Sequence, residues 1–378
     1  MTGKPRHIVM TVNASWNVLN FRLPLLRALL ARGDRVTVLA PPDDAVAALI
    51  GEGARHVPLK MDTKGLNPLR DGALVGRLAR HFRAQAPDVV LSWTIKNNLF
   101  GAFAARRVGV PFIPNVTGLG TAFLSGGLLQ RVAETLYRAA FPRLDTVFFQ
   151  NEDDRALFVG RKLVRAGQAR LLPGSGIDLA RFAPAPLPDG GPDAGPAFLM
   201  IARLLRDKGV VEYAQAARLV RARHPGAQFR LLGALGAENR SAIDAATLAG
   251  WQAAGDVVYL GQTDDVRPAI AAADVVVLPS YREGAPRTLI EAAAMARPLI
   301  ATDVPGCRAV VGDGVSGYLC AVRDAASLAE ACLRMIALAP AARAAMGQAG
   351  RRKMEAEFDE RIVVAAYLDA IARVTGGA

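Results

Sequence analysis

The sequence contains no long apolar run. No stretch of about 18 residues, the length that spans a bilayer as a helix, is free of charged side chains. Residues 1–15 lead directly into a β-strand pattern instead of the apolar segment of a signal peptide. These absences predict a cytoplasmic protein.

Cysteine and aromatic residues are also scarce. The three cysteines show neither C-x-x-C nor Cys/His spacing, so we expect reduced thiols that bind no metal: Cys307, Cys320 and Cys332. Aromatic residues make up 6% of the chain, and no basic run is interleaved with them as in proteins that bind single strands. The sequence therefore argues against nucleic acid as a partner.

Histidine clusters and the D-x-D spacing of carboxylates are missing too. The four histidines are scattered, and we expect them to be surface or packing residues: His7, His56, His81 and His224. Three acidic pairs occur, none of which reads D-x-D: Asp43-Asp44, Asp153-Asp154 and Asp264-Asp265. Although Mg²⁺ needs only one or two carboxylates beside substrate phosphates, no metal site is predicted.

Length and composition indicate two α/β domains. The 378 residues exceed what one core usually accommodates. Hydrophobic residues make up 52% and alternate between short strand-like and longer helix-like runs. Lys and Arg number 46 against 34 Asp and Glu, a net charge of +12, which favours an anionic partner such as a diphosphate or an acidic membrane.

Strand and helix patterns alternate along the chain, as in parallel sheets built from right-handed βαβ units. In the first half, strands are expected at His7–Val12, Arg35–Ala40, Asp88–Ser92, Pro111–Val116 and, as the last one, Thr146–Gln150. Helices are expected at Phe21–Ala31, Leu74–Gln85 and Asn98–Arg107. The second half repeats the pattern with strands at Ala197–Ala202, Gln228–Gly233, Val257–Leu260 and Val275–Leu278, and a helix at Val211–Arg223.

A stretch rich in proline and glycine, Ala183–Pro196, marks a surface loop at the junction of the two halves. We therefore expect a first Rossmann-like domain at residues 1–173, a connection at 174–196 and a second Rossmann-like domain at 197–356. The final helix, within 357–378, is expected to pack back across the first domain. Two such domains facing one another would bind ligands in a cleft lined by the carboxyl ends of both sheets.

The segment 280–314 carries the most chemical information. Glu283 and Glu291 stand eight residues apart around Gly284-Ala285-Pro286. Pro286 is predicted to be the first residue of a helix, which places Glu283 on the loop before it. A helix N-terminus favours a diphosphate, and carboxylates suit sugar hydroxyls. The spacing alone also fits an ordinary strand, loop and helix with solvated acids.

Three motifs, occurring in this order, resemble the retaining glycosyltransferases of family 4 (group 1). They are ARLLRDKG at Ala202–Gly209, LGQTDDV at Leu260–Val266 and PSYREGAPRTLIEA at Pro279–Ala292. The resemblance covers nearly the whole chain. It implies the GT-B fold, two facing Rossmann-like domains with a cleft between them, and a nucleotide-sugar donor with no cofactor.

The resemblance assigns the leaving group to Arg203 and Lys208, which follow a predicted strand. Together they would neutralise a nucleoside diphosphate without a metal, since arginine offers a planar fork and lysine a movable charge. The residues alone would also fit a solvated basic turn before a helix. In the family, the glutamate at the position of Glu291 holds the ribose hydroxyls, and the one at Glu283 lies beside the donor sugar.

The remaining donor contacts implied by the resemblance are main-chain ones. Gly284, Ala285 and Pro286 would form a turn of small residues that lets the backbone touch the ligand. Thr263 matches a segment whose backbone meets the nucleotide base.

The first half departs from many relatives, which carry a donor-contacting histidine that this sequence lacks. Its segments SWTIKNNLFG (Ser92–Gly101) and NVTGLGTAF (Asn115–Phe123) resemble a subgroup that extends sugars on polyprenyl diphosphate. The candidates for the acceptor or donor-sugar side are Lys96, Thr117, Gly118 and Gly120. The two glycines also fit a purely structural loop.

The loop after the first strand lacks the Gly-Gly pair of many relatives. Asn13, Asn17 and Arg22 could instead donate hydrogen bonds to a phosphate or an acceptor hydroxyl. They could equally cap the helix that is expected to start near Phe21.

Residues 123–143 form an amphipathic pattern with arginines at the rim, Arg131 and Arg138. Its apolar positions are Leu128, Leu129, Val132, Leu136, Ala140 and Phe141. Such a helix fits an anionic bilayer surface or a protein core. The surplus positive charge and the lipid-linked acceptors of the subgroup favour the bilayer, so we expect peripheral attachment to the inner face of the plasma membrane.

These features predict a retaining glycosyltransferase that moves a hexose or N-acetylhexosamine from a nucleotide sugar, UDP by family habit, to a polyprenyl-diphosphate-linked saccharide. The product would serve bacterial surface polysaccharide or glycan assembly. Two alternatives stay open: a non-hydrolysing sugar-nucleotide epimerase, and a catalytically silent module that binds anions or membranes.

Overall fold

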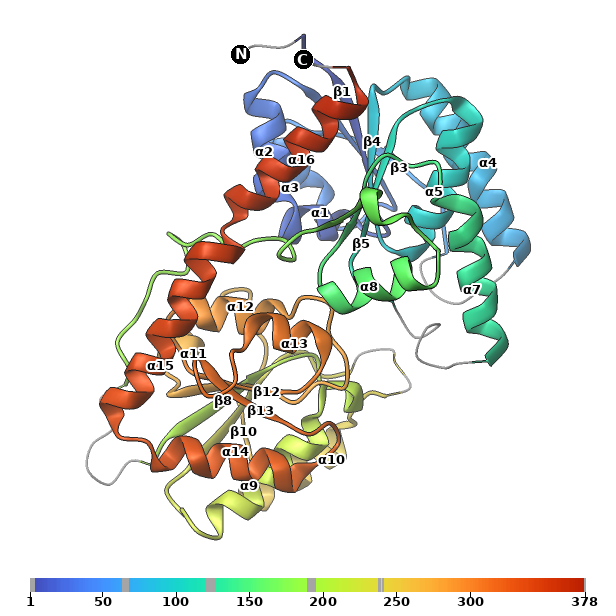
Figure 1. The fold of residues 1–378 in the computed structure, drawn as a ribbon. Helices are drawn as coiled ribbons and strands as arrows, with labels where there is room; N and C mark the ends of the chain where they lie inside the picture. The colour runs from blue at the N-terminus through green and yellow to red at the C-terminus, as the bar shows by residue number, and fades with distance from the viewer. Residues whose placement is uncertain are drawn as a thin grey trace. The chain divides into compact units, whose positions relative to one another are not determined.

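The computed structural model describes residues 4–62, 68–119, 127–188, 195–236, 239 and 241–376 (Figure 1). The chain divides into two units, each of which is a parallel α/β structure. The first unit comprises Met1–Gly176 and Glu360–Ala378, and the second comprises Ile177–Asp359.

The first unit contains a parallel seven-stranded sheet in the order β3-β2-β1-β4-β5-β6-β7. Its strands are β1 (His7–Thr11), β2 (Arg35–Ala40), β3 (Arg55–Pro58), β4 (Val89–Trp93), β5 (Phe112–Val116), β6 (Val147–Phe149) and β7 (Ala169–Leu171). Its α-helices are α1 (Ser15–Phe21), α2 (Leu23–Ala31), α3 (Val46–Gly51), α4 (Pro68–Gln85), α5 (Ile95–Val108), α7 (Gly127–Ala140), α8 (Glu152–Gly160) and α16 (Glu360–Val374).

Helices cover both faces of this sheet, because successive side chains of a strand point to opposite sides. In β1, Ile8 and Met10 join a core shared with α1, α2, α3 and α16, whereas Val9 joins a core shared with α4, α5, α7 and α8. The strand order reverses between β1 and β4, and in open α/β sheets ligands bind at the carboxyl ends of such strands.

The second unit contains a parallel six-stranded sheet in the order β10-β9-β8-β11-β12-β13. Its strands are β8 (Ala197–Ile201), β9 (Gln228–Leu232), β10 (Val258–Tyr259), β11 (Val275–Leu278), β12 (Leu299–Thr302) and β13 (Gly317–Cys320). Its helices are the short η2 (Arg206–Lys208), α9 (Val210–Arg221), α10 (Ala245–Ala253), α11 (Arg267–Ala271), α12 (Arg287–Ala294), α13 (Pro305–Val310), α14 (Ala325–Ala337), α15 (Pro340–Lys353) and η3 (Met354–Phe358). Here the order reverses between β8 and β11.

The elements of the first unit differ from the prediction in several places, of which the following change the topology or divide a helix. The helix predicted at Phe21–Ala31 is two helices, α1 and α2, which meet at Arg22. Pro24 explains the break, because its ring would clash with the carbonyl four residues earlier in a continuous helix. Thr146–Gln150 is not the last strand, since β7 follows it, and β3 was not predicted at all.

Helix α7 packs its apolar positions into the first unit. Tyr137 and Phe141 are fully buried and Ala140 is 4% exposed, in the core that also contains α5 and α8. Val132 is 48% exposed, so it alone of the predicted stripe's described side chains faces outward. The predicted apolar face of this helix therefore belongs mainly to the core, which corrects the interpretation that it faces a bilayer. The side chains of Leu128 and Leu129 lie outside the described set.

No single helix in the described part of the chain is long and apolar enough to cross a membrane. Helices α14 and α15 with η3 pass that test of length and composition only as a pair, bent by 115°.

The final helix, α16, belongs to the first unit although it follows the second in sequence. Tyr367 is fully buried against Trp93, with ring centroids 5.7 Å apart, and its hydroxyl accepts a hydrogen bond from Asn115 Nδ2 at 2.9 Å. The chain from Ile177 onward belongs to the second unit, where Ile177 and Phe182 enter the core beside α12.

Candidate functional site

A lysine and a glutamate meet at the carboxyl ends of β8 and β11, the strands between which the second sheet reverses its order. Lys208 ends the short helix η2, and its Nζ lies 2.5 Å from Oε1 of Glu283 in the loop after β11. The two side chains are 25% and 12% exposed. The pair is thus largely shielded but reachable, and the structure brings together two residues that the sequence analysis selected.

The turn that carries Lys208 is fixed to the β11 loop by main-chain contacts. The amide of Tyr281 donates to Asp207 O at 2.9 Å, and Ser280 Oγ donates to the same oxygen at 3.2 Å. Gly209 follows with a φ of +76°, and a Cβ there would lie 2.0 Å from Pro279 O. Only glycine fits this position, because any side chain would push the turn away from the strand end.

The loop of Glu283 packs against the segment that joins β12 to α13. A Cβ at Gly306, in the first turn of α13, would lie 2.6 Å from the carbonyl oxygens of both Glu283 and Gly284. Thr302, at the end of β12, donates a hydrogen bond to Ser280 O. These supporting residues were missed from the sequence, because nothing in their local pattern shows which distant loop they contact.

Helix α12 begins one residue later than predicted. Pro286 is its N-cap, with extended φ and ψ of −74° and 101°, and Arg287 is the first helical residue. Thr288 Oγ1 donates to Ile201 O at 3.1 Å, which ties this first turn to the end of β8. Gly284 and Ala285 form the half-buried turn before it, as predicted.

Glu291 lies on α12 and is 7% exposed. Arg287 Nε, one turn earlier, donates to its Oε1 at 2.6 Å. Burial raises the pKa of Glu291, while the charges of Arg287 and Arg181 lower it and that of Asp265 raises it. A carboxylate in this position, one turn into the helix, can accept hydrogen bonds from ligand hydroxyls.

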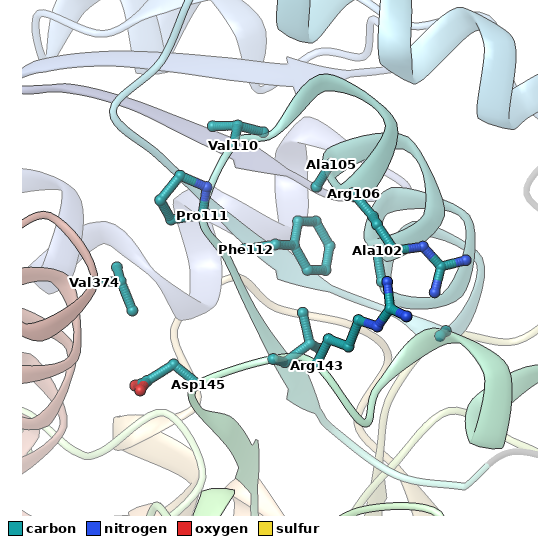
Figure 2. A pocket seen from close by; sticks show the side chains of 11 residues that line it. Ala102, Ala105, Arg106, Val110, Pro111, Phe112, Arg143, Asp145 and Val374 are labelled. Atoms are coloured by element: carbon teal, nitrogen blue, oxygen red, sulfur yellow. The ribbon is translucent and has the colours of Figure 1, made fainter.

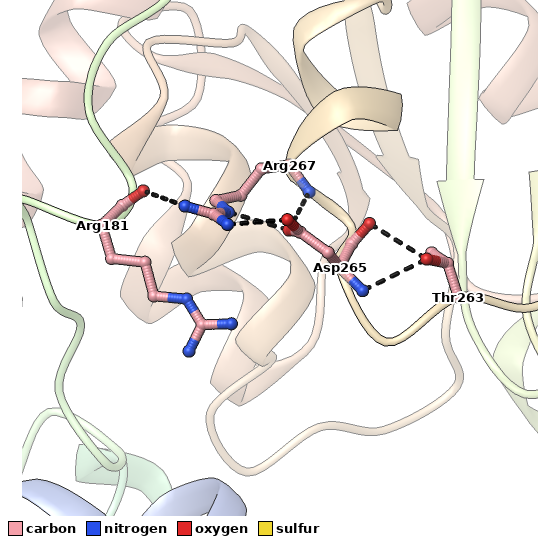
Figure 3. A network of polar contacts seen from close by, with 4 residues as sticks. All are labelled: Arg181, Thr263, Asp265 and Arg267. Atoms are coloured by element: carbon pink, nitrogen blue, oxygen red, sulfur yellow. Dashed lines mark hydrogen bonds and ion pairs between the residues drawn. The ribbon is translucent and has the colours of Figure 1, made fainter.

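The loop after β10 is held by a compact polar network (Figure 3). Arg267 binds Asp265 through two hydrogen bonds, Nε to Oδ1 at 2.8 Å and Nη2 to Oδ2 at 2.7 Å, and the Arg267 side chain holds the pKa of Asp265 down to about 2. Thr263 Oγ1 accepts from the Asp265 amide and donates to its carbonyl, both at 3.2 Å. Arg267 also reaches Arg181 O at 3.4 Å.

Thr263 therefore lies on an exposed turn whose conformation is fixed by hydrogen bonds. The sequence analysis selected Thr263 but missed Asp265 and Arg267, whose hydrogen bonds stabilise the turn. Their spacing of two residues could have suggested an ion pair, but it does not show which loop the pair holds.

Arg203 is exposed and forms no ion pair with any residue in the described part of the chain. It lies two residues after the end of β8, and its guanidinium has no hydrogen-bond or ion-pair partner among the residues that the structure describes. An arginine in this state is available to bind an oxyanion.

The candidates of the first unit follow the carboxyl ends of its strands. Asn13 follows β1 and is half-buried, while Thr117 and Gly118 follow β5. Lys96, in the first turn of α5 after β4, lies 2.8 Å from Asp71 Oδ1, with side chains 12% and 8% exposed. The structure therefore places these residues at one edge of the sheet, with the lysine charge already paired. Gly120 lies outside the described residues.

The capping role considered for the loop after β1 is not observed. Asn17 lies inside α1, and the N-caps of α1 and α2, Ala14 and Arg22, make no side-chain capping bond. Arg22 instead donates to Ser175 Oγ at 2.7 Å and stacks over Trp93 at 5.2 Å from the ring centroid.

Two histidines of the first unit make structural contacts, as predicted. His7 bonds Gln85 O and Thr37 Oγ1 at 2.8 Å each, and burial lowers its pKa. His56 contacts Ala40 O at 3.2 Å. Within the described residues, no group of three or more His, Cys, Asp or Glu side chains is arranged to hold a metal ion.

Comparison with known proteins shows a consistent set of similarities. The model "Glycosyl transferase 4-like domain" matches residues 21–174, and "Glycosyl transferases group 1" matches residues 195–337. The N,N'-diacetylbacillosaminyl-diphospho-undecaprenol alpha-1,3-N-acetylgalactosaminyltransferase of Campylobacter jejuni is 28% identical, over 96% of this chain and 97% of its own. The UDP-Gal:alpha-D-GlcNAc-diphosphoundecaprenol alpha-1,3-galactosyltransferase of Escherichia coli is 26% identical, over 78% and 76%.

Among solved structures, the sucrose-phosphate synthase of Thermosynechococcus elongatus superposes with a TM-score of 0.80 at 21% identity. The match covers 99% of this chain and all of that one, which shows that the two share a fold.

Proposed function

The chain belongs to the group 1 glycosyltransferases with the GT-B fold, and from that premise we propose that it is a retaining enzyme acting on a lipid-linked acceptor. It would move a hexose or N-acetylhexosamine from a UDP-sugar to a saccharide carried on polyprenyl diphosphate. Two relatives support this acceptor class, since both are named for diphospho-undecaprenol substrates, and one is named for UDP-Gal as donor.

The observation that carries the proposal is the contact of Lys208 with Glu283 at the carboxyl ends of β8 and β11, next to helix α12, which carries Glu291. Lys208 and Arg203 would neutralise the donor diphosphate, which the N-terminus of α12 also favours. Glu291, buried and ionisable, would accept hydrogen bonds from the ribose hydroxyls. Glu283 would lie by the donor sugar, and the braced loop of Thr263 would meet the base.

The chemical step needs no separate protein base in this scheme. The bond from the sugar's anomeric carbon to the diphosphate oxygen breaks, and the acceptor hydroxyl bonds to the same carbon on the same face. The hydroxyl proton passes to the departing phosphate. Lys208 and Arg203 stabilise the charge that develops on this leaving group, which is the interaction that strengthens in the transition state.

The test of this function is the release of nucleoside diphosphate with and without a polyprenyl-diphosphate-linked saccharide. We expect UDP release only when the acceptor is present, and NMR of the product should show the anomeric configuration of the donor. An epimeric donor formed without acceptor would indicate the epimerase instead. Donor binding without turnover would indicate a silent module, and an inverted product would contradict retention.

Metal independence is a second expectation, because Arg203 and Lys208 would neutralise the charge of the diphosphate without a metal ion. Treatment with EDTA should leave the rate of transfer unchanged, and added Mg²⁺ or Mn²⁺ should not raise it. Loss of activity with EDTA and its recovery with either ion would contradict the roles given to Arg203 and Lys208.

The pH dependence should report on Glu291. Burial raises its pKa and Arg287 lowers it, so removing Arg287 should raise that pKa further. Because the ionised carboxylate is the form that accepts from ribose hydroxyls, acidification of Arg287→Met should raise the donor KM beginning at a higher pH than in wild type. Arg287→Lys keeps the charge and should restore the wild-type profile. Superimposable profiles of KM against pH would contradict this role.

We further propose peripheral attachment to an anionic membrane on its cytoplasmic side, where lipid-linked acceptors would be met. The support is the net charge of +12 and the exposed Arg131, Val132 and Arg138 on α7. Flotation with phosphatidylglycerol liposomes at moderate salt should recover more protein than with neutral liposomes. Equal recovery from both would exclude an electrostatic attachment.

A further inference from the structure

A pocket lies in the first unit, at the amino-terminal edge of its sheet (Figure 2). It has a volume of about 330 Å³, within the range of small-molecule sites. Its walls come from the end of α5, the start of β5, the link from α7 to β6 and the end of α16. The residues that line it are Ala102, Ala105, Arg106, Val110, Pro111, Phe112, Ala140, Arg143, Leu144, Asp145 and Val374.

This pocket is separate from the candidate site of the first unit. Val110 and Pro111 precede β5, whereas Thr117 and Gly118 follow it. The pocket and the polar loops therefore lie at opposite ends of the same strand. Whatever binds here would not occupy the sugar-transfer site.

The floor of the pocket is apolar. Ala102, Ala105 and Phe112 are between 1% and 4% exposed. The ring of Phe112 rests directly on α5 at Gly101, where a Cβ would lie 2.7 Å from its Cζ. The ring packs against the helix at this glycine and forms one wall of the pocket. Such a surface suits a short hydrocarbon group.

The mouth of the pocket carries unneutralised positive charge. Figure 2 shows the guanidinium groups of Arg106 and Arg143 on one side of Phe112 and the Asp145 carboxylate on the other, and both arginines are exposed. Arg106 donates to the carbonyl of Ala139 at 3.0 Å, and neither arginine contacts a carboxylate among the residues that the structure describes. Two positive charges that line one pocket favour an anion there.

Asp145 does not cancel this charge. Its Oδ2 accepts a hydrogen bond from Thr146 Oγ1 at 2.8 Å and lies 3.9 Å from Arg373 Nε. Arg373, which lies outside the lining of the pocket, also pairs with Asp369 at 2.6 Å. The lining itself holds two arginines and this one carboxylate, a net charge of +1. The net charge of the mouth remains positive.

We propose that this pocket binds an amphiphilic oxyacid, a phosphate or carboxylate head joined to a short apolar body. The head lies between Arg106 and Arg143, where guanidinium groups form charge-assisted hydrogen bonds with its oxygens. The apolar body lies on Phe112 and Val110. Either a soluble acid or the end of an anionic lipid has this chemistry.

The test is calorimetric titration of the full-length protein with hexyl phosphate, in a Lys208→Ala background that weakens binding at the donor site. We expect saturable binding with one site, and affinity reduced roughly 10-fold or more by Arg106→Ala and by Arg143→Ala. Arg107→Ala is the matched control, since this neighbouring exposed arginine does not line the pocket, and it should bind as the background does. Because Arg143 makes no hydrogen bond within the described structure, its variant should keep the wild-type thermal stability.

The probe is compared with inorganic phosphate, which has the head without the body and should bind more weakly. Flotation with vesicles containing phosphatidic acid separates the two sources. Recovery that falls in Arg143→Ala but not in Arg107→Ala indicates a lipid, and equal recovery indicates a soluble acid. Absence of saturable binding, unchanged affinity in both pocket variants, or inorganic phosphate binding as tightly as hexyl phosphate would overturn the proposal.

Discussion

Replacing Lys208 by alanine is expected to lower kcat/KM for sugar transfer by about 10-fold to 150-fold. One charge-assisted hydrogen bond contributes ~1.5–3 kcal/mol, and each 1.4 kcal/mol is a factor of ten. The loss should appear in kcat as well as KM, because the leaving diphosphate gains charge as the glycosidic bond breaks. Glu291→Ala should lose a similar factor, chiefly through weaker donor binding.

The Lys208 result needs a control for the ion pair with Glu283. Removing the lysine also leaves a carboxylate that is only 12% exposed without this partner. Circular dichroism should show an intact fold, and the double variant Lys208→Ala/Glu283→Gln, in which no unpaired carboxylate is left, should be at least as impaired as the single one. His81→Ala, on α4 in the first unit, should change the kinetics little. Near-normal kinetics in both Lys208→Ala and Glu291→Ala would remove the assignment of the donor site.

Sequence reasoning located the central strands of both sheets because their apolar runs are bounded by turn residues. Val275–Leu278 and Arg35–Ala40 were predicted with the bounds that the structure has. It failed on β3, Arg55–Pro58, whose residues are half-exposed and only weakly apolar. It also treated α1 and α2 as one helix, since the apolar periodicity continues across Arg22 and Pro24 was given too little weight.

In the candidate site, the sequence analysis identified residues whose side-chain chemistry occurs within a recognisable sequence motif. Lys208, Glu283 and Glu291 lie in motifs that resemble a known family, and two of them meet in space. The supports were not recognised. Gly209 and Gly306 matter because carbonyl oxygens 70 and 23 residues away approach them, counting from Pro279 and Glu283. Such contacts arise only when the strands are stacked side by side, and no local pattern encodes them.

A buried arginine in the second unit illustrates the same limit. Arg297, after α12, is 0% exposed, and burial lowers its pKa. Its guanidinium donates to four carbonyl oxygens: Ile270 at 2.9 Å, Ala185 at 2.8 Å, Pro186 at 2.6 Å and Ala271 at 2.8 Å. Ala185 and Pro186 belong to the segment that the sequence presented as a connection between domains. The arginine therefore fastens that segment to the second unit.

Arg297→Ala is expected to destabilise the second unit by about 3–5 kcal/mol, because leaving one buried acceptor without its donor costs about 1–3 kcal/mol and several are left here. Four carbonyls would lose their donor and a cavity would remain. Hydrogen exchange of peptides from Ile177–Asp359 measures this unit separately from the first, and its slowest amides should lose protection by that amount. Arg352→Ala, an exposed arginine on α15, should stay within about 0.5 kcal/mol of wild type. Protection lost equally in both variants, or in neither, would show that Arg297 is not the fastening that its four hydrogen bonds imply.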